Sequence, residues 1–245
     1  GVAVCRHGPD EALLMAGGPF AVVPAALPPR GFAAVRAALF ALALVPFAEL
    51  VRLGFTGGLG ANPVEFVLRW LGTWTLVALL ATLAITPLRW VTGWAWLIRL
   101  RRMLGLYAFF YGTLHVASYV WIDHFFNWTD IVDDITRRPY LTFGFMAYAL
   151  MIPLAITSTN AMVRRLGGRN WQRLHRIVYL VAVLGVLHYW YHKLAKNDLE
   201  TPTIYALVLG ALLGARLLRW MGRRRAIVPA PPRERQGRRD SPAKS

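Results

Sequence analysis

The sequence predicts an all-α integral membrane protein, built as a bundle of six transmembrane helices. Hydrophobic residues make up 56% of the 245 residues and charged residues only 16%, which is typical of a polytopic membrane protein. Uncharged runs of membrane-spanning length alternate along the chain with short clusters of arginine. Most of the arginine lies beside the ends of these runs or in the C-terminal tail. Membrane topology therefore explains the net charge of +16, and no nucleic-acid partner is expected.

Six apolar runs follow one another along the chain. They cover about residues 32–51, 64–86, 103–122, 140–159, 175–192 and 202–220. The first is the weakest, because Arg36 must extend toward the interface and Pro46 interrupts its helix. Pro63 can serve as the first residue of the second helix, which is expected to stop at Pro87. The acidic segment after the third run and the arginine-rich segment after the fourth are expected to be loops.

The distribution of lysine and arginine predicts the orientation of the bundle. The loops after the second and fourth runs hold four and five arginines, and the C-terminal tail is more basic still. The other loops hold one or two basic residues each, and the excess of positive charge marks the cytoplasmic side. Both termini are therefore expected in the cytoplasm (N-in/C-in). Residues 32–221 would form the membrane domain, with disordered extensions at 1–31 and 222–245.

Most catalytic and metal-binding patterns are missing from the sequence. Cys5 is the only cysteine, so neither a disulfide framework nor a thiolate metal site can form. The apolar runs contain no paired carboxylates, and the glycine-rich segment 57–60 lacks the Lys-Ser/Thr of a phosphate-binding loop. No dinucleotide-binding fingerprint is present. A metal would therefore have to be held by histidine, by carboxylate or inside a cofactor.

Two histidines within the apolar runs are the strongest functional candidates. An imidazole inside a membrane span is costly and is expected to face the interior of the bundle. If both helices enter from the cytoplasm, near Met103 and His175, a rise of 1.5 Å per residue places His115 at a depth of about 18 Å and His188 at about 20 Å. The two rings should therefore meet at one level, between the third and fifth helices.

A glycine precedes each of these histidines by three residues, Gly112 before His115 and Gly185 before His188. Because positions i and i+3 share a helix face, each glycine should leave a gap beside an imidazole where a planar macrocycle could lie. This arrangement favours a bis-histidine haem b clamped between two helices. The alternative is a pair of unrelated core histidines, each bonded to a backbone carbonyl.

The remaining candidates lie nearer the membrane surfaces. His175 stands at the predicted cytoplasmic boundary, about 140° around the helix from His188, where it could bind a second haem, contact a flavin or only cap the interface. Arg101 shares the helix face of His115 at the height of His175, so this pair could bracket the propionates or the phosphate of a cofactor. For His124 and His192, near the opposite surface, a structural role is favoured.

Six ordered motifs resemble those of a known family. They are GGLGANPVE (57–65), LLATLAITPLR (79–89), RRMLGLYAFFYGTLHVASY (101–119), RPYLTFG (138–144), TSTNAMVRRLG (157–167) and WQRLHRIVYLVAVLGVLHY (171–189). In these motifs and in its histidine spacing the chain is similar to the MsrQ family. Its members are haem-binding membrane subunits of bacterial periplasmic methionine sulfoxide reductase systems, related to the transmembrane domains of ferric reductases and NADPH oxidases. The resemblance covers about residues 36–219 and implies a ferric reductase-like bundle.

The resemblance implies an electron conduit in the bacterial inner membrane. A cytoplasmic flavin reductase or the quinone pool would supply electrons, and haem b would carry them across the membrane. The acceptor would be a periplasmic molybdopterin-containing catalytic subunit that reduces methionine sulfoxide in oxidised envelope proteins. The key histidines of the family fall on His115, His175 and His188. FMN is also implied, with its phosphate near the basic loop that carries Arg101 and Arg102.

The chain departs from the oxidase relatives in two respects. It has Arg101 where they carry a second histidine on the third helix, which leaves the number of haems open between one and two. It also lacks their flavin and nucleotide domains, so direct oxidation of NADPH is not expected.

Two other functions stay open at this point. One is a ferric or superoxide-forming reductase of the same fold, which would act on a small molecule at the far membrane surface. The other is a non-redox membrane scaffold or permease whose histidines are structural. The rate at which ferric chelates reoxidise the reduced protein distinguishes such a reductase from an electron conduit. The presence of a haem absorbance band distinguishes an electron conduit from a non-redox scaffold or permease.

Overall fold

The computed structural model describes residues 28–194 and 197–225, and within this part of the chain every regular element is a helix. The elements are α1 (Pro29–Thr56), α2 (Pro63–Thr92), the 3-10 helix η1 (Ala95–Leu100), α3 (Arg101–Ser118), the π-helical turn η2 (Tyr119–Asp123), α4 (Trp128–Arg137), α5 (Pro139–Ile156), α6 (Asn160–Leu166), α7 (Gly168–His175), α8 (Ile177–Leu194) and α9 (Glu200–Arg225). The predicted all-α class is confirmed. Most of the predicted extensions at 1–31 and 222–245 lie outside the described residues, so these domain boundaries stay predictions.

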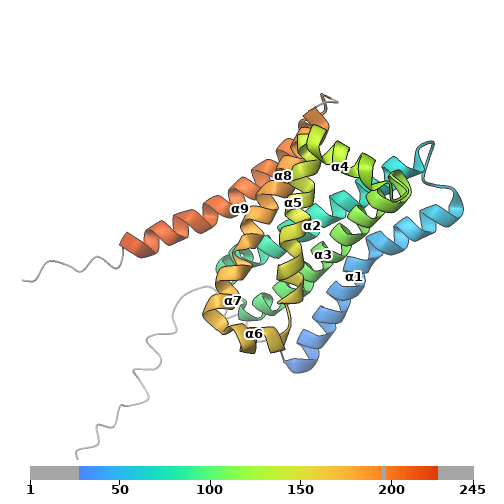
Figure 1. Ribbon diagram of the computed structural model, residues 1–245. Helices are drawn as coiled ribbons and strands as arrows, with labels where there is room; N and C mark the ends of the chain where they lie inside the picture. The colour runs from blue at the N-terminus through green and yellow to red at the C-terminus, as the bar shows by residue number, and fades with distance from the viewer. Residues whose placement is uncertain (1–27, 195–196, 226–245) are drawn as a thin grey trace, which may run out of the picture.

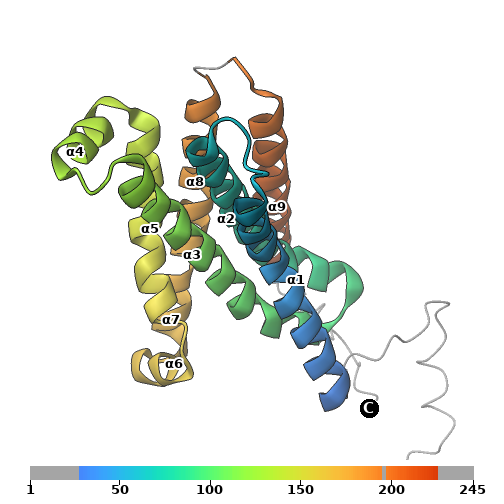
Figure 2. The ribbon, with the colours of Figure 1, turned by 90° about the vertical axis from the view of Figure 1, so that its right-hand side faces the viewer.

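The four helices at the centre of the bundle form two pairs. α2 packs most extensively against α3, and α5 against α8, while contacts of α3 with α5 and of α2 with α8 join the pairs. α1 lies against α2 and α3, and α9 lies against α8 and α2 (Figures 1 and 2). In both views α4 lies at one end of the bundle and α6 and α7 lie at the opposite end. The interior between the two pairs is where the candidate site lies.

Small residues allow the central helices to approach one another closely. Ala108 of α3 and Ala182 of α8 have no exposed surface, and they belong to one core cluster with Leu83 of α2 and Met151 of α5. Within a membrane, helices associate through close packing and interhelical hydrogen bonds, because lipid is as apolar as the helix surfaces. Close approach brings side chains of one helix within reach of the backbone carbonyls of the next.

Local sequence sets where the second helix begins and ends. Asn62 accepts a hydrogen bond from the backbone N–H of Glu65 (3.2 Å), and Pro63 occupies the first position of α2 as predicted. Gly93 closes the helix in the left-handed conformation (φ 74°), which glycine adopts without a steric penalty.

Five helices in the described ranges are long and apolar enough to cross a membrane, namely α1, α2, α5, α7 together with α8, and α9. This makes the chain a multi-pass membrane protein. α3, which coincides with the predicted third span, is not among the five. It packs against α1, α2 and α5, so neighbouring helices cover much of its surface and it can carry more polar residues than a lipid-facing helix. Six spans and the N-in/C-in orientation stay predictions.

Pro87 does not end the second helix, contrary to the prediction. α2 continues through it to Thr92. A proline inside a helix removes the backbone donor for the carbonyl four residues earlier, which here belongs to Leu83. The guanidinium of Arg216, on α9, donates a hydrogen bond to that carbonyl. A side chain from another helix therefore satisfies the group that Pro87 leaves open, as is common in membrane helices.

The predicted interruption at Pro46 is also wrong, because α1 runs unbroken from Pro29 to Thr56. Carbonyls beside this proline receive hydrogen bonds from the central helices. The Tyr111 hydroxyl donates to Ala43 (2.6 Å), and the Trp70 indole donates to Pro46 itself (2.9 Å). These bonds attach α1 to α2 and α3.

Two predicted loops contain helices. The acidic segment forms α4, whose Ile131 is buried, and the arginine-rich segment forms α6 and α7. His175 is therefore the last residue of α7, and the fifth predicted span begins at Ile177 after a break at Arg176. Both segments are short helices at the ends of the bundle, and hydropathy alone does not distinguish these from loops.

The role of Arg216 at Pro87 can be tested with a double-mutant cycle. Arg216→Met removes the donor and should lower the free energy of unfolding by about 1–3 kcal/mol, because the Leu83 carbonyl loses its partner. In a Pro87→Ala background the new backbone N–H can bond that carbonyl, so the same substitution should cost less. The measurement is denaturant unfolding of the detergent-solubilised protein. Equal costs in the two backgrounds would show that Arg216 does not compensate for the proline.

Candidate functional site

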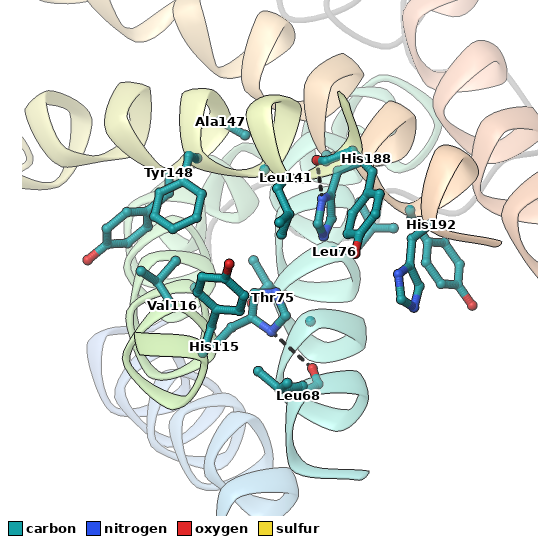
Figure 3. Close-up of a pocket in the computed structure, with 18 of the residues that line it drawn as sticks. Leu68, Thr75, Leu76, His115, Val116, Leu141, Ala147, Tyr148, His188 and His192 are labelled. Carbon is teal, nitrogen blue, oxygen red and sulfur yellow. Dashed lines mark hydrogen bonds between the residues drawn. The ribbon is translucent and has the colours of Figure 1, made fainter. Parts of the chain in front are cut away.

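His115 of α3 and His188 of α8 point into a common cavity between the two central helix pairs (Figure 3). The centres of their rings lie 6.1 Å apart, and the ring planes meet at 75°. Their depths along the two helices predict that these rings lie at one level of the bundle, and the structure brings them close together.

The same hydrogen bond holds each imidazole. Nδ1 of His115 lies 2.9 Å from the Leu68 carbonyl on α2, and Nδ1 of His188 lies 2.7 Å from the Tyr140 carbonyl on α5 (Figure 3). A carbonyl can only accept, so Nδ1 must carry the hydrogen in both rings. In the neutral imidazole this leaves a free lone pair on Nε2. Metal-binding histidines are typically oriented by such a bond to a carbonyl.

Two glycines on the neighbouring helices make these hydrogen bonds possible. A Cβ atom on Gly144 of α5 would lie 2.7 Å from Nδ1 of His188, closer than real contacts allow. A Cβ atom on Gly72 of α2 would lie 3.2 Å from Cε1 of His115, which is also tight. Each imidazole therefore lies directly on a helix backbone that carries no side chain at that point.

The two halves of the site repeat one local arrangement. Gly72 follows Leu68 by four residues on α2, and Gly144 follows Tyr140 by four residues on α5. Residues four apart lie one above the other on a helix, so the glycine opens the helix surface directly beside the accepting carbonyl. The pairs α2–α3 and α5–α8 each present one imidazole in this way, and the two meet at the centre of the bundle.

The predicted glycines lie elsewhere in the site. Gly112 and Gly185 line the cavity, but the histidine rings are not their nearest neighbours. An added Cβ would meet Thr75 Cγ2 at 3.5 Å at the first position and Leu76 Cδ1 at 3.7 Å at the second, both ordinary contacts. The sequence analysis missed Gly72 and Gly144, because they lie on other helices and no pattern within one helix connects them to the histidines.

The cavity has an apolar body and one polar end. Leu76, Leu141 and Ala147 are among the apolar residues that line it. Polar residues line the part formed by the start of α2, by η2, by the start of α5 and by the end of α8; they are Glu65, Arg69, Asp123, Arg138 and His192. A ligand that fits this lining combines an apolar body with charged groups at one edge.

Arg138 is held at this polar end by two neighbours. Its Nε lies 3.3 Å from Asp134 Oδ1, and its Nη1 donates to the Tyr140 hydroxyl at 3.4 Å. The hydrogen bond to Tyr140 raises the pKa of Arg138 further above its already high ordinary value. Arg69 follows Leu68 on α2 and takes part in no ion pair with the described acidic residues. The cavity is therefore lined by one cation from each half of the site, Arg69 on α2 and Arg138 immediately before α5.

His175 does not belong to this cavity. Its Nδ1 lies 3.1 Å from the Trp171 carbonyl, its ring stacks on Trp171 at 3.9 Å, and its Nε2 lies 3.4 Å from the Ser158 hydroxyl. Arg101 and Arg102 lie within electrostatic range of it. The structure therefore brings these three predicted residues together, but at the end of the bundle that carries α6 and α7.

His124 and His192 lie at the polar end of the bundle. Nε2 of His124 lies 3.5 Å from Asp134 Oδ2, and the ring of His192 lies 5.2 Å from that of Tyr140. His192 also lines the cavity. In residues 28–194 and 197–225, no group of three or more His, Cys, Asp or Glu could hold a bare metal ion. A metal between His115 and His188 would need its other ligands from a cofactor.

The fold and the site together define the class of protein: a membrane helix bundle in which histidines of two helices face each other across a central cavity. The family model described as "Ferric reductase like transmembrane component" matches residues 69–186, the stretch from α2 to α8 that contains both histidines. No solved structure matches the chain.

Similar proteins identify the family more closely. Over 208 residues the chain is 57% identical to the "Protein-methionine-sulfoxide reductase heme-binding subunit MsrQ" of Ralstonia nicotianae, which covers 84% of this chain and 96% of the relative. Proteins of the same name are 52% identical in Herminiimonas arsenicoxydans (78% and 88% covered) and 51% identical in Bordetella pertussis (83% and 99%). The chain belongs to the MsrQ family, and the resemblance seen in its motifs is confirmed.

A series of glycine substitutions tests which positions adjoin the histidines. Gly144→Ala should lower the free energy of unfolding by about 1–3 kcal/mol through overpacking against His188, with a smaller loss for Gly72→Ala. Gly112→Ala and Gly185→Ala should be neutral or stabilising by up to about 1 kcal/mol, because alanine favours the helix. Denaturant unfolding of the four variants in detergent gives the order. A larger loss at Gly112 or Gly185 than at Gly144 would contradict the geometry.

Proposed function

We propose that the chain is a haem b-binding membrane subunit that passes electrons across the bacterial inner membrane to a periplasmic methionine sulfoxide reductase. One observation carries the proposal: two imidazoles, each fixed through Nδ1, direct their free Nε2 atoms into one cavity. The name of the relatives, a heme-binding subunit of protein-methionine-sulfoxide reductase, supports both the cofactor and the system.

The residues of the cavity fit a haem. His115 and His188 would hold the haem iron, because their rings lie 6.1 Å apart in one cavity and the hydrogen bond of each Nδ1 leaves Nε2 available to a metal. A macrocycle supplies the remaining ligands that the described residues lack. Gly112 and Gly185 line the same cavity and would leave room for the macrocycle. When bound, the haem iron supplies one-electron chemistry, and the protein tunes it through axial ligation, hydrogen bonds and burial.

The polar end of the cavity fits the acidic edge of a haem. Arg69 and Arg138 would pair with the propionates, because a guanidinium binds a carboxylate through charge-assisted hydrogen bonds. The apolar residues around the rest of the cavity would exclude water from the iron. The chain's own role in electron transfer is therefore to hold the cofactor at a fixed place and to shield it.

The second group of predicted residues lies at the other end of the bundle. Arg101, Arg102 and His175 are close enough to act on one another, and they are the residues to which we assign FMN or a second haem. Electrons would enter here, from a cytoplasmic flavin reductase or from quinone, and would leave at the opposite end to the molybdopterin-containing catalytic subunit. The predicted orientation places this entry in the cytoplasm.

The family model's description favours one alternative, a reductase that acts on ferric chelates itself. The two functions differ in the rate of reoxidation. Reduced, purified protein should lose electrons slowly to a ferric chelate and rapidly to the methionine sulfoxide reductase in the presence of methionine sulfoxide. Rapid reoxidation by the chelate alone would favour the ferric reductase.

The axial ligands can be tested by alanine substitution. His115→Ala and His188→Ala should each abolish low-spin haem, because one of the two ligands is lost. His192→Ala and His124→Ala are matched controls and should retain it. Absorbance spectra and pyridine haemochrome content of purified protein give the result, and added imidazole should restore the low-spin spectrum in a His→Ala variant that still folds. A wild-type spectrum in either ligand variant would refute the assignment, and no haem in the wild type would favour a scaffold.

The propionate assignment can be tested through the reduction potential. Removing a cation near the haem disfavours the added electron, so Arg69→Gln and Arg138→Gln should lower the potential by on the order of tens of millivolts. Arg137→Gln is the control, because Arg137 is exposed, pairs with Asp133 and does not line the cavity. A potentiometric titration followed by absorbance gives each value. Equal shifts in Arg137→Gln and Arg138→Gln would remove Arg138 from the propionate site.

A further inference from the structure

Exposed apolar side chains gather at the end of the bundle that carries α4. Trp121 of η2, Phe125 and Phe126 of the turn that follows, and Trp128 and Val132 of α4 are each 53–80% exposed. The ring of Phe126 lies 6.5 Å from that of Trp121 and 6.5 Å from that of Trp128, so these side chains form one continuous surface, the aromatic patch. A large exposed apolar patch marks an interaction surface for a protein or for a membrane.

The backbone holds two of these rings outward in a conformation that costs energy. Phe125 (φ 46°) and Phe126 (φ 62°) lie in the left-handed region, which residues with a bulky side chain rarely adopt. The N–H of Phe126 donates to the Val120 carbonyl (2.9 Å) and that of Asn127 donates to the His124 carbonyl (2.8 Å), and these bonds fix the turn. Both rings stay mostly exposed, so the strain is not repaid by burial within the chain. Strained backbone that presents exposed side chains indicates a functional surface.

α4 has an apolar side and a charged side. At 100° per residue its side chains separate into two arcs. The apolar arc consists of Trp128, Ile131, Val132 and Ile135, and the opposite arc consists of Asp130, Asp133 and Arg137. Ile131 is buried against the bundle, in a cluster with Tyr119 and Leu141. The exposed apolar residues of α4 therefore adjoin the side that faces the bundle, and the charged residues face away from it.

The membrane surface fits the aromatic patch better than a protein partner does. α4 ends at Arg137, and α5, one of the helices apolar enough to cross a membrane, begins at Pro139. Figure 2 shows α4 beside the start of α5, at the outer edge of the bundle. The patch therefore lies at the level where a spanning helix begins, and tryptophan is enriched at this level of a bilayer. A protein that approached this end from the water would meet the acidic side of α4 first.

We propose that α4 lies on the bilayer surface as an interfacial anchor, with the aromatic patch inserted at the boundary between lipid headgroups and acyl chains. An amphipathic helix binds a membrane in this way through the apolar area that it buries. The anchor would also steady one side of the central cavity, because Asp134 of α4 pairs with Arg138 (3.3 Å), which lines that cavity. The proposal does not depend on haem binding or on the redox partner.

Nitroxide labels on single cysteines can test the anchor residue by residue. The full-length protein carries Cys5→Ser, and the labelled variants form two pairs of sequence neighbours, Trp128→Cys with Thr129→Cys and Val132→Cys with Asp133→Cys. In each pair the first residue belongs to the patch and the second is an exposed residue outside the apolar arc. The protein is reconstituted into vesicles of phosphatidylcholine and phosphatidylglycerol. Power saturation then measures collisions of the label with oxygen, which concentrates in the bilayer, and with a nickel chelate, which stays in water.

The two members of each pair should differ in what their labels contact. The ratio of oxygen to nickel collisions should be at least about threefold higher at the patch residue than at its neighbour. At the patch it should approach the ratio of a label at Met146→Cys, an exposed position on the spanning helix α5. A low ratio at all four sites would overturn the anchor and would leave the patch to a partner in water. A high ratio at all four would overturn it as well, because the acidic side of α4 would then lie in lipid.

A second measurement tests whether the lipid contact holds α4 in place. The double variant Trp128→Ser/Val132→Ser keeps the buried Ile131 but removes apolar area from the patch. In vesicles it should raise the hydrogen-exchange rate of residues 128–137 about tenfold or more and leave that of α5 unchanged, because α4 opens locally. Asp133→Ser, on the charged side, is the matched control and should change the rate less than about twofold. No increase in the double variant, or an equal increase in the control, would contradict the anchor.

Discussion

The site depends on the close approach of two imidazoles to the backbones of neighbouring helices. His115 and His188 can donate to the carbonyls of Leu68 and Tyr140 only because a glycine follows each carbonyl by four residues. This one bond determines three properties at once: the tautomer, the direction of the free nitrogen, and the distance between α2 and α3 or between α5 and α8. A histidine without it could rotate, and the free nitrogen would no longer be directed into the cavity.

The bond also reconciles two interpretations of the histidines. A hydrogen bond to a backbone carbonyl is what a purely structural core histidine makes, and it is equally what orients a metal ligand. The difference lies in what the second nitrogen faces. Here both second nitrogens face a cavity with cations at one end. Two structural histidines would have no reason to converge on the same space from different helix pairs.

The sequence predicts the parts of this structure that are encoded within one helix. Apolar runs locate the spans, and the positions of His115 and His188 along their helices place both rings at one level. Contacts between helices are not predictable in this way. Gly72 and Gly144 matter because of histidines 43 and 44 residues later in the chain, and Pro87 stays helical because Arg216, far along the chain, replaces its missing donor. The tendency of Pro87 to end a helix is overridden by Arg216, which lies beside it only in the folded structure.

Charge divides the bundle into two unlike ends. Arg89, Arg101 and Arg216 form no ion pair with the described acidic residues and make the end at α6 and α7 electropositive, whereas aspartates gather at the end that carries α4. A positive environment favours an anionic donor and stabilises an added electron, because the reduced form of a cofactor carries less positive charge. On the proposed function, electrons would arrive at the electropositive end and leave at the acidic one, so the fixed charge would attract an anionic donor to the entry but would not itself drive electrons toward the exit. The orientation rule that places arginine in the cytoplasm would then also place the entry for electrons there.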